Sequence, residues 1–196
     1  MADFILASAS PRRRELMELM GIDFEVIVSD ADESAVPTDL SIKLYVQELA
    51  LLKATATAKQ ILKRKKAHII AADTVVTLDG KILGKPKDKE DAVNMLTELS
   101  GKTHEVYTGI CVMRMSDAKS VCKSVCTRVS FKELSADKIK AYVNTNEPMD
   151  KAGAYGIQGI GSMLIDGIEG DYFNVVGLPV ATLSDLLEEE FDITVL

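Results

Sequence analysis

The chain has 196 residues, enough for one large domain or for two small lobes around a sizeable core. Its 47% hydrophobic and 27% charged residues are typical of a soluble globular protein. The net charge of −7 argues against general binding to nucleic-acid backbones or to anionic membranes. An acidic chain can still bind a polyanion through a local cluster of cations or through a metal.

The sequence predicts a soluble, cytoplasmic protein. Residues 4–7 are apolar but too few for a signal peptide, and the sequence contains no run of 18 apolar residues. The three cysteines, Cys111, Cys122 and Cys126, are odd in number and lack CxxC or zinc-site spacing. We therefore expect reduced thiols that pack on strands, as is usual in the cytosol.

The hydrophobic pattern predicts a mixture of helices and strands along the chain. The expected elements, in chain order, are a strand at 4–7, a helix at 15–20, a strand at 22–29, a helix from 41 to about 66, a hairpin within 67–86, a helix from 88 to 101, a long hairpin at 103–115 and 119–131, a helix at 135–143, a glycine-rich loop at 147–161, a strand at 162–168 and a final helix that ends near 190. The sequence shows no internal repeat and no clear linker.

A basic turn opens the first helix. Ser10 is a typical N-cap and Pro11 suits the first helical position, so the arginines from Arg12 to Arg14 follow at the helix N-terminus. Cations there oppose the helix dipole, whereas a bound anion would be attracted by the dipole, the free N–H groups and the guanidinium groups together. The alternative interpretation is a solvated basic turn in which Arg14 pairs with Glu18.

Two further charged features have two interpretations each. Residues 30–34 form a loop with three acids, which is either an exposed turn or a source of one or two carboxylates for a divalent metal. Lys53 falls on the apolar side of the long helix, so its ammonium either extends to solvent or reaches a cleft. That apolar stripe consists of Ile42, Tyr45, Val46, Leu49, Leu52 and Ala56.

Residues 67–86 are typical of a buried strand, a tight turn and a short return strand. Neither face of residues 69–78 is polar, which suits a strand that is covered on both sides. The pair Asp79-Gly80 suits a two-residue type I′ turn, in which both central residues need a positive φ. Such a turn would bring Lys85 back beside Asp73.

Asp73 interrupts this apolar run, on the strand face that also carries Ile69 and Ala71. Burial of an unpaired carboxylate typically costs several kcal/mol. Asp73 is therefore either a structural residue satisfied by backbone N–H groups, or it has a charged partner, a metal or an opening onto a cleft.

Residues 147–161 form a glycine-rich loop. The loop matches neither the Walker pattern nor the GxGxxG fingerprint in its strand–helix context. By composition it is only a loop, but Lys151 and Gln158 are polar side chains that a ligand could contact.

Several motifs occur together in one order along the chain. They are Ser8-x-Ser-Pro-Arg-Arg13, Ala72-Asp-Thr-Val-Val76 with Leu83-Gly-Lys-Pro86, Leu99-Ser-Gly-Lys-Thr-His-Glu-Val-Tyr-Thr-Gly109, Asp150-Lys-Ala-Gly-Ala-Tyr-Gly-Ile-Gln-Gly159 and Gly170-Asp-Tyr-Phe-Asn-Val-Val-Gly-Leu-Pro179. Together they closely resemble the Maf family of nucleoside triphosphate pyrophosphatases, over essentially the whole chain.

The resemblance implies a fold and an activity. The implied fold is α/β, a single domain over residues 1–196 with an elongated curved mixed sheet flanked by helices and two lobes with a central cleft, related to the inosine triphosphate pyrophosphatases. The implied enzyme is a nucleoside triphosphate diphosphatase that cleaves between the α- and β-phosphates with Mg²⁺ or Mn²⁺. The resemblance also suggests a homodimer.

The resemblance also implies the roles of particular residues. Asp73 matches the proton acceptor, and Glu33 matches a carboxylate near the metal, so both are expected metal ligands. Lys85 completes the expected catalytic set. The residues expected to bind the substrate are Ser8, Ser10, Arg12, Arg13, Lys53, Thr74 and Gln158.

The identity of three of these residues favours pyrimidine substrates. As the family resemblance implies, the branch of the family that acts on dTTP and UTP carries Arg, Thr and Gln at the positions of Arg12, Thr74 and Gln158. The branch that acts on 7-methyl-GTP instead tends to have Trp at the Arg12 position and a carboxylate at the Gln158 position. A uracil or thymine edge suits an amide, which both donates and accepts. We therefore expect hydrolysis of dTTP, UTP and modified pyrimidine nucleotides, with a role in cleaning the nucleotide pool.

Two alternatives remain open. One is a nucleotide-sensing regulatory protein without significant catalysis, in line with the association of the family with cell-division arrest. A pure binder would have no need of the set Glu33, Asp73 and Lys85. The other is a pyrophosphatase for another base, such as 7-methyl-GTP.

Overall fold

The structure is a computed structural model that describes residues 3–195. Its strands are β1 (Asp3–Leu6), β2 (Phe24–Val26), β3 (Ala67–Leu78), β4 (Lys81–Leu83), β5 (Thr103–Arg114), β6 (Ser120–Phe131) and β7 (Ile165–Glu169). Its α-helices are α1 (Pro11–Leu19), α2 (Ile42–Gln60), α3 (Lys89–Leu99), α4 (Ala136–Val143), α5 (Tyr172–Val176) and α6 (Val180–Phe191). Short 3₁₀-helices are η1 (Glu33–Ala35), η2 (Glu147–Asp150), η3 (Ala152–Ala154) and η4 (Gly159–Leu164).

The strands form one mixed sheet. Their order is β2-β1-β3-β5-β6-β7, and the short β4 pairs with β3. Strand β1 is parallel to both of its neighbours, with Phe4 opposite Phe24 of β2 and His68 of β3. Strands β3 and β4 are antiparallel, as are β6 and β7. The expected mixed α/β fold, with a sheet flanked by helices, is confirmed.

The chain divides into two compact units. The first comprises Met1–Asp73, Thr108–Val125 and Gly177–Leu196, and the second comprises Thr74–Tyr107 and Cys126–Val176. Strands β3, β5 and β6 contribute residues to both units.

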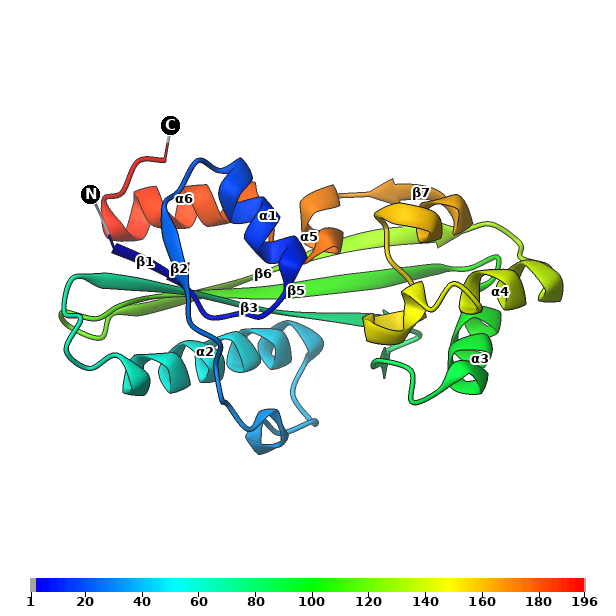
Figure 1. Cartoon of the computed structure of the whole chain (residues 1–196), viewed down its shortest axis with the longest axis horizontal. Coiled ribbons are helices and arrows are strands. Elements are labelled where there is room, and N and C mark those ends of the chain that lie inside the picture. The colour runs from blue at the N-terminus through cyan, green and yellow to red at the C-terminus, as the bar shows by residue number, and fades with distance from the viewer. Residues whose placement is uncertain (1–2, 196) are drawn as a thin grey trace. The chain divides into compact units, whose positions relative to one another are not determined.

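In the first unit, α2 lies on one side of the strands, and α1 and α6 lie on the other side (Figure 1). The α2 side is filled by alternate residues of β3, Ile69 and Ala71, which pack in one cluster with Ala50 and Ala54 of the helix. Buried Cys111 of β5 belongs to the same cluster, and its thiol is free. The small alanines allow the helix to lie close to the sheet.

Gly109 of β5 brings α2 and the sheet into direct backbone contact. A Cβ atom at this position would lie 2.1 Å from the carbonyl oxygen of Val46 in α2 and 2.8 Å from the amide nitrogen of Gln47. Any other residue would therefore clash with backbone atoms that cannot move without moving the helix. The glycine of the motif that ends at residue 109 thus fixes the position of α2.

In the second unit, α3 and α4 pack against each other and share one core with the strands. Asp88 caps α3, with its carboxylate accepting from the Asp91 N–H group at 2.8 Å, and Gly101 follows the helix with a φ of 68°. The core of this unit includes Leu96, Leu99, Val106, Val129, Phe131, Ile139, Tyr142, Val143, Tyr155 and Leu164.

His104 is buried in this core, with only 2% of its surface exposed. Its Nε2 atom lies 2.8 Å from the hydroxyl of Tyr155, and the ring of Phe131 meets it edge-on. Burial lowers the pKa of His104 to about 4, so the imidazole is neutral in the folded protein at neutral pH.

The hairpin within residues 67–86 forms as expected. Asp79 and Gly80 both have positive φ angles, 51° and 78°, between the paired residues Leu78 and Lys81. The long hairpin of β5 and β6, the α4 helix and the Ser10 cap with Pro11 at the start of α1 are likewise confirmed.

Several boundaries differ from the sequence expectation. Helix α2 ends at Gln60, not near residue 66, because the chain turns there and Arg64 bonds to Asp3 and Glu25 beside β1 and β2. Helix α1 already begins at Pro11, and β2 is limited to residues 24–26. Strand β7 begins at Ile165, because residues 159–164 form η4.

The buried stripe of α2 agrees with the expectation at Val46 and Leu49 and differs from it at other positions. Ala50, Ala54 and Thr57 are buried, whereas Leu52 and Ala56 are only half-buried. The small residues Ala50 and Ala54 face the sheet, and Gly109 leaves room for the helix backbone to approach it closely. In residues 3–195, no helix is both long and apolar enough to cross a membrane.

Candidate functional site

The first unit brings three of the expected residues into one ionic cluster. The ammonium of Lys53 lies 2.5 Å from Oδ1 of Asp73 and 2.8 Å from Oε1 of Glu33. The side chains of Lys53 and Asp73 are only 14% and 13% exposed, whereas Glu33 is 57% exposed. A nearly buried ion pair is therefore joined by one carboxylate that reaches it from a solvent-exposed segment.

The fold of the first unit explains why Asp73 interrupts an apolar strand. Ile69 and Ala71 point toward α2, and Asp73 is the next residue on the same face of β3. The helix supplies Lys53 at this level, one residue before the buried Ala54. The Asp73 carboxylate therefore pairs with the Lys53 ammonium at a position where the apolar pattern indicated a hydrophobic contact. The interpretation that Lys53 extends freely to solvent is wrong.

The three acidic residues within residues 30–34 bond to different partners. The Asp32 carboxylate caps η1 by accepting from the N–H group and the hydroxyl of Ser34, and these bonds lower its pKa. Asp30 accepts from the side-chain amide of Gln60 at 3.1 Å. Of the three, Glu33 is the acid that bonds to Lys53.

The Ser8 turn orients Arg13. Oγ of Ser8 accepts from the Ser10 N–H group and from Nη1 of Arg13, both at 3.2 Å. The Nε group of Arg13 donates to the carbonyl oxygen of Gly177 at 2.8 Å. Ser10 caps α1 by accepting from the Arg13 N–H group. Arg13 is thus fixed from two directions.

Arg13 belongs to the same electrostatic environment as the cluster. Burial lowers its pKa below the ordinary value, the charges of Asp73 and Glu33 act in the opposite direction, and the neighbouring Arg12 adds to the lowering. Arg12 is half-buried and Arg14 is exposed, so the three arginines do point in different directions, as helix geometry requires.

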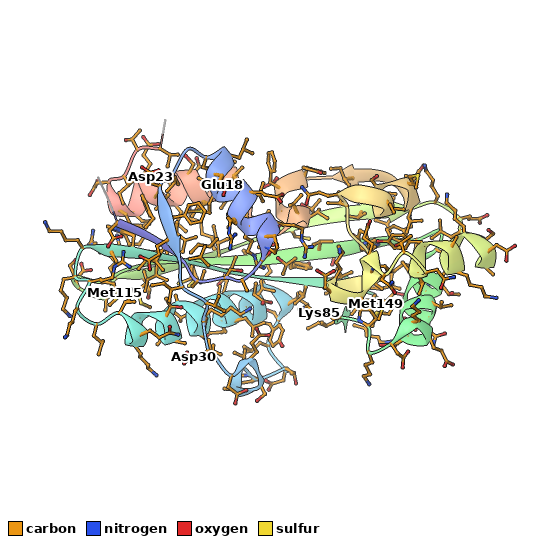
Figure 2. All side chains as sticks on the ribbon, in the orientation of Figure 1. Glu18, Asp23, Asp30, Lys85, Met115 and Met149 are labelled. Atoms are coloured by element: carbon orange, nitrogen blue, oxygen red, sulfur yellow. The ribbon has the colours of Figure 1, made fainter. Side chains whose placement is uncertain are left out.

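The second unit carries the other three expected residues. Thr74 follows Asp73 in β3 and is half-buried. Lys85 lies just after β4 and is exposed (Figure 2). The β3–β4 pairing ends at Val76 and Leu83, so Lys85 lies beyond the last paired residue, and its expected proximity to Asp73 stays a prediction. Gln158 is exposed and immediately precedes η4.

The glycine-rich loop is more ordered than its composition indicated. It contains η2, η3 and the start of η4, and the Gly153 N–H group donates to the carbonyl oxygen of Gly84, beside Lys85. The ammonium of Lys151 donates to the Glu147 carbonyl oxygen and to the Asp150 carboxylate, both at 2.6 Å. Lys151 therefore stabilises the loop through these two bonds. Of Lys151 and Gln158, the two polar side chains that a ligand could contact, Gln158 is the exposed one.

Tyr45 is a residue of this region that the sequence interpretation assigned only to a core stripe. Tyr45 lies in α2 eight residues before Lys53, on the same side of the helix, and its side chain is half-buried. Its pKa is raised, first by burial and then by the charges of Asp73 and Glu33. The spacing of Tyr45, Leu49 and Lys53 was the signal that could have identified it.

Glu147 is a second residue that the sequence interpretation did not identify. Its carboxylate accepts from the hydroxyl of Tyr142 and from the N–H groups of Ile160 and Gly161, at 2.9 to 3.0 Å. A single glutamate in a polar loop shows no periodicity or spacing that would have indicated these contacts.

This chain is similar to a sequence profile, to named relatives and to one solved structure. The sequence profile described as Maf-like protein matches residues 3–190. A dTTP/UTP pyrophosphatase of Acetivibrio thermocellus is 51% identical, over 100% of this chain and 98% of that protein, and one of Clostridium novyi is 52% identical, over 91% and 93%. The structure of a HAM1 protein from Coxiella burnetii aligns with a TM-score of 0.46 at 18% identity, over 67% of this chain and 73% of that chain. The profile match and the identities near one half show that this chain belongs to the Maf-like protein family.

Proposed function

We propose that this protein is a nucleoside triphosphate pyrophosphatase that hydrolyses dTTP and UTP between the α- and β-phosphates. Relatives of about the same length and half identical in sequence carry the name dTTP/UTP pyrophosphatase. The observation that carries the proposal is the position of the Lys53 ammonium between Asp73 and Glu33. This arrangement combines an acceptor for a proton with a cation for phosphate oxygens.

The triphosphate chain would be bound at the Ser8 turn and the ionic cluster. Arg13 offers a planar guanidinium that suits two phosphate oxygens, and it is already oriented by Ser8 and Gly177. Lys53 offers a compact charge close to the proton acceptor. We assign Lys85, which is exposed, to the same phosphate chain.

A divalent metal fits the residues of the cluster. Arg13, Lys53, Glu33 and Asp73 carry two positive and two negative charges, so these four groups together do not neutralise a triphosphate. Glu33 and Asp73 converge on one cation, Lys53, and Mg²⁺ usually takes only one or two protein carboxylates besides phosphates and water. We assign Glu33 and Asp73 as ligands of Mg²⁺ or Mn²⁺, which would neutralise phosphate charge.

Asp73 would accept the proton of the attacking water. As the water oxygen forms a bond to the α-phosphorus, its proton passes to the Asp73 carboxylate, and the bond from the α-phosphorus to the bridging oxygen breaks. Pyrophosphate leaves with that electron pair, and the nucleoside monophosphate remains. Lys53 and Arg13 stabilise the negative charge that moves onto the leaving oxygens.

Base selection is assigned to Arg12, Thr74 and Gln158. The exposed Gln158 amide can donate to a carbonyl oxygen of uracil or thymine and accept from the neighbouring N3–H group. This assignment rests on the family resemblance and on the exposure of Gln158.

A nucleotide panel tests the proposal. Pyrophosphate release would be measured with Mg²⁺ for dTTP, UTP, 7-methyl-GTP and the common purine nucleotides. We expect the highest kcat/KM for dTTP and UTP. Binding of nucleotides without pyrophosphate release would contradict the proposal and identify a nucleotide-sensing protein instead. Preference for 7-methyl-GTP would contradict the assignment of the base.

We also propose that the protein is a homodimer and that it is located in the cytoplasm. The homodimer rests on the family resemblance, and the cytoplasmic location rests on the composition. Sedimentation at several protein concentrations tests the homodimer, and a single mass equal to that of one chain would contradict it.

A further inference from the structure

Glu147 lies at the centre of a hydrogen-bond network in the second unit. Its Oε1 atom accepts from the Tyr142 hydroxyl at 3.0 Å and from the Gly161 N–H group at 2.9 Å. Its Oε2 atom accepts from the Ile160 N–H group at 3.0 Å. All of these donors lie in the same unit, two of them just after Gln158.

The network holds the chain on both sides of Gln158. On the near side, the Gly156 N–H group donates to the Tyr142 hydroxyl at 3.2 Å. On the far side, Gly159 has a φ of 70°, and a Cβ atom there would lie 2.9 Å from Oε2 of Glu147. Residues 156–161 are therefore fixed closely against the carboxylate, while the Gln158 side chain itself is exposed.

Glu147 is held in turn by its own neighbours. Its N–H group donates to Oγ1 of Thr145 at 3.2 Å, and its carbonyl oxygen accepts from the Lys151 ammonium at 2.6 Å. Partial burial tends to raise the pKa of Glu147, but the N–H groups of Gly161 and Ile160 and the Tyr142 hydroxyl outweigh it, and the pKa is lowered. The carboxylate is therefore ionised at neutral pH and accepts only.

An amide could not replace this carboxylate. Glu147 faces three donors, and a glutamine at this position would direct its own NH₂ group toward at least one of them in either orientation. The glycine-rich segment would then have to move away from residue 147. The acceptor-only character of the side chain is thus what the local structure requires.

We propose that Glu147 is a positioning residue for substrate selection, which fixes residues 156–161 so that the Gln158 amide meets the pyrimidine base in one orientation. The inference rests on the proposed function, because that proposal assigns Gln158 to the base. A loop fixed in advance does not have to be ordered when the nucleotide binds, so its order contributes directly to affinity.

The test is the steady-state kinetics of Glu147→Gln with dTTP and UTP. We expect KM to rise about tenfold with kcat unchanged, because the loss of matched acceptors loosens the segment that contacts the base but not the phosphate-binding cluster. Inhibition by inorganic tripolyphosphate, which has no base, should be the same as for the wild-type protein. Glu169→Gln is the matched control, since the Glu169 carboxylate of the same unit pairs with Arg128 at an exposed position.

A double variant separates positioning from general damage. If Glu147 acts through Gln158, then Glu147→Gln combined with Gln158→Ala should have the same KM as Gln158→Ala alone. Additive effects of the two substitutions would overturn the inference, as would a parallel loss of tripolyphosphate inhibition. Tyr142→Phe, which removes one donor to Glu147 and the acceptor of Gly156, gives a second route if Glu147→Gln fails to fold.

The two proposals fail in different ways. If the wild-type protein releases no pyrophosphate from dTTP or UTP, the proposed function is overturned and the inference with it. If the wild-type protein is active and neither Glu147→Gln nor Tyr142→Phe changes KM, only the inference is overturned.

Discussion

The ammonium of Lys53 lies 2.5 Å from the Asp73 carboxylate and joins helix α2 to strand β3. Both side chains are largely withdrawn from water, so the pair is a structural contact between the helix and the strand. Removal of either charge alone leaves the other in a nearly buried position, which is more costly than removal of both.

The Lys53 ammonium should contribute to stability only as part of the pair. Lys53→Met should destabilise the protein by about 3 kcal/mol, because the Asp73 carboxylate loses its cation. The double variant with Asp73→Asn should recover most of this loss. The free energies of unfolding in urea measure both effects, with Lys123→Met as a control at an exposed pair with Glu189, where about 0.5 kcal/mol is expected. Equal losses at both lysines would contradict the structural role of Lys53.

Gly109 should be intolerant of a side chain. Gly109→Ala should destabilise the protein by about 1–3 kcal/mol and lower turnover, because the new methyl group displaces α2 at Val46 and moves Lys53 with it. Gly167→Ala is the control, since a Cβ atom there meets no described atom within 4 Å. Thermal unfolding and pyrophosphate release together check this prediction, and a Gly109→Ala protein as stable and active as the control would refute it.

Buried His104 should make the fold sensitive to acid. Its pKa is about 4 in the folded state against 6.5 ordinarily, so the unfolded chain binds a proton more readily. The free energy of unfolding is not reduced by His104 above pH 6.5. It decreases as the pH falls toward 4, by up to about 3 kcal/mol, because the unfolded chain then binds the proton that the folded chain does not. Urea unfolding at several pH values measures the slope, and His104→Gln should flatten it. His68, whose pKa is also lowered by burial, contributes with the same sign.

The metal requirement should depend on Glu33 and not on its neighbour Asp32. Chelation of divalent cations should abolish pyrophosphate release, and Mg²⁺ or Mn²⁺ should restore it. Glu33→Gln should raise the Mg²⁺ concentration for half-maximal rate about tenfold, which corresponds to the loss of one charged ligand. Asp32→Asn should leave this concentration unchanged, because Asp32 caps η1. The same Mg²⁺ dependence in both variants would remove Glu33 from the metal site.

Local patterns in the sequence predicted much of this molecule. The break in the apolar run at Asp73, the Asp79-Gly80 turn and the Ser10 cap are local signals, and each is confirmed in the structure. Helix periodicity also placed Lys53 on the inner side of α2. These features depend on residues that are close together in the chain.

Contacts between distant residues were beyond such patterns. The Gly177 carbonyl oxygen that orients Arg13 lies 164 residues away in the sequence. Only the folded loop shows that Glu33, and neither Asp30 nor Asp32, reaches Lys53. The role of Glu147 depends on a loop whose glycines gave no helix or strand period. The end of α2 at Gln60 likewise depends on Arg64 meeting β1 and β2.

The most direct test of the proposed chemistry is pyrophosphate release from dTTP by the wild-type protein and by Asp73→Asn. The amide keeps the size of the side chain but cannot accept the proton of the attacking water, so we expect kcat to fall by about 10²-fold or more. At a saturating Mg²⁺ concentration, which compensates for the weaker metal ligand, binding of dTTP and the circular dichroism spectrum should be largely retained. Turnover by Asp73→Asn at the wild-type rate would contradict the assignment of Asp73 as the proton acceptor.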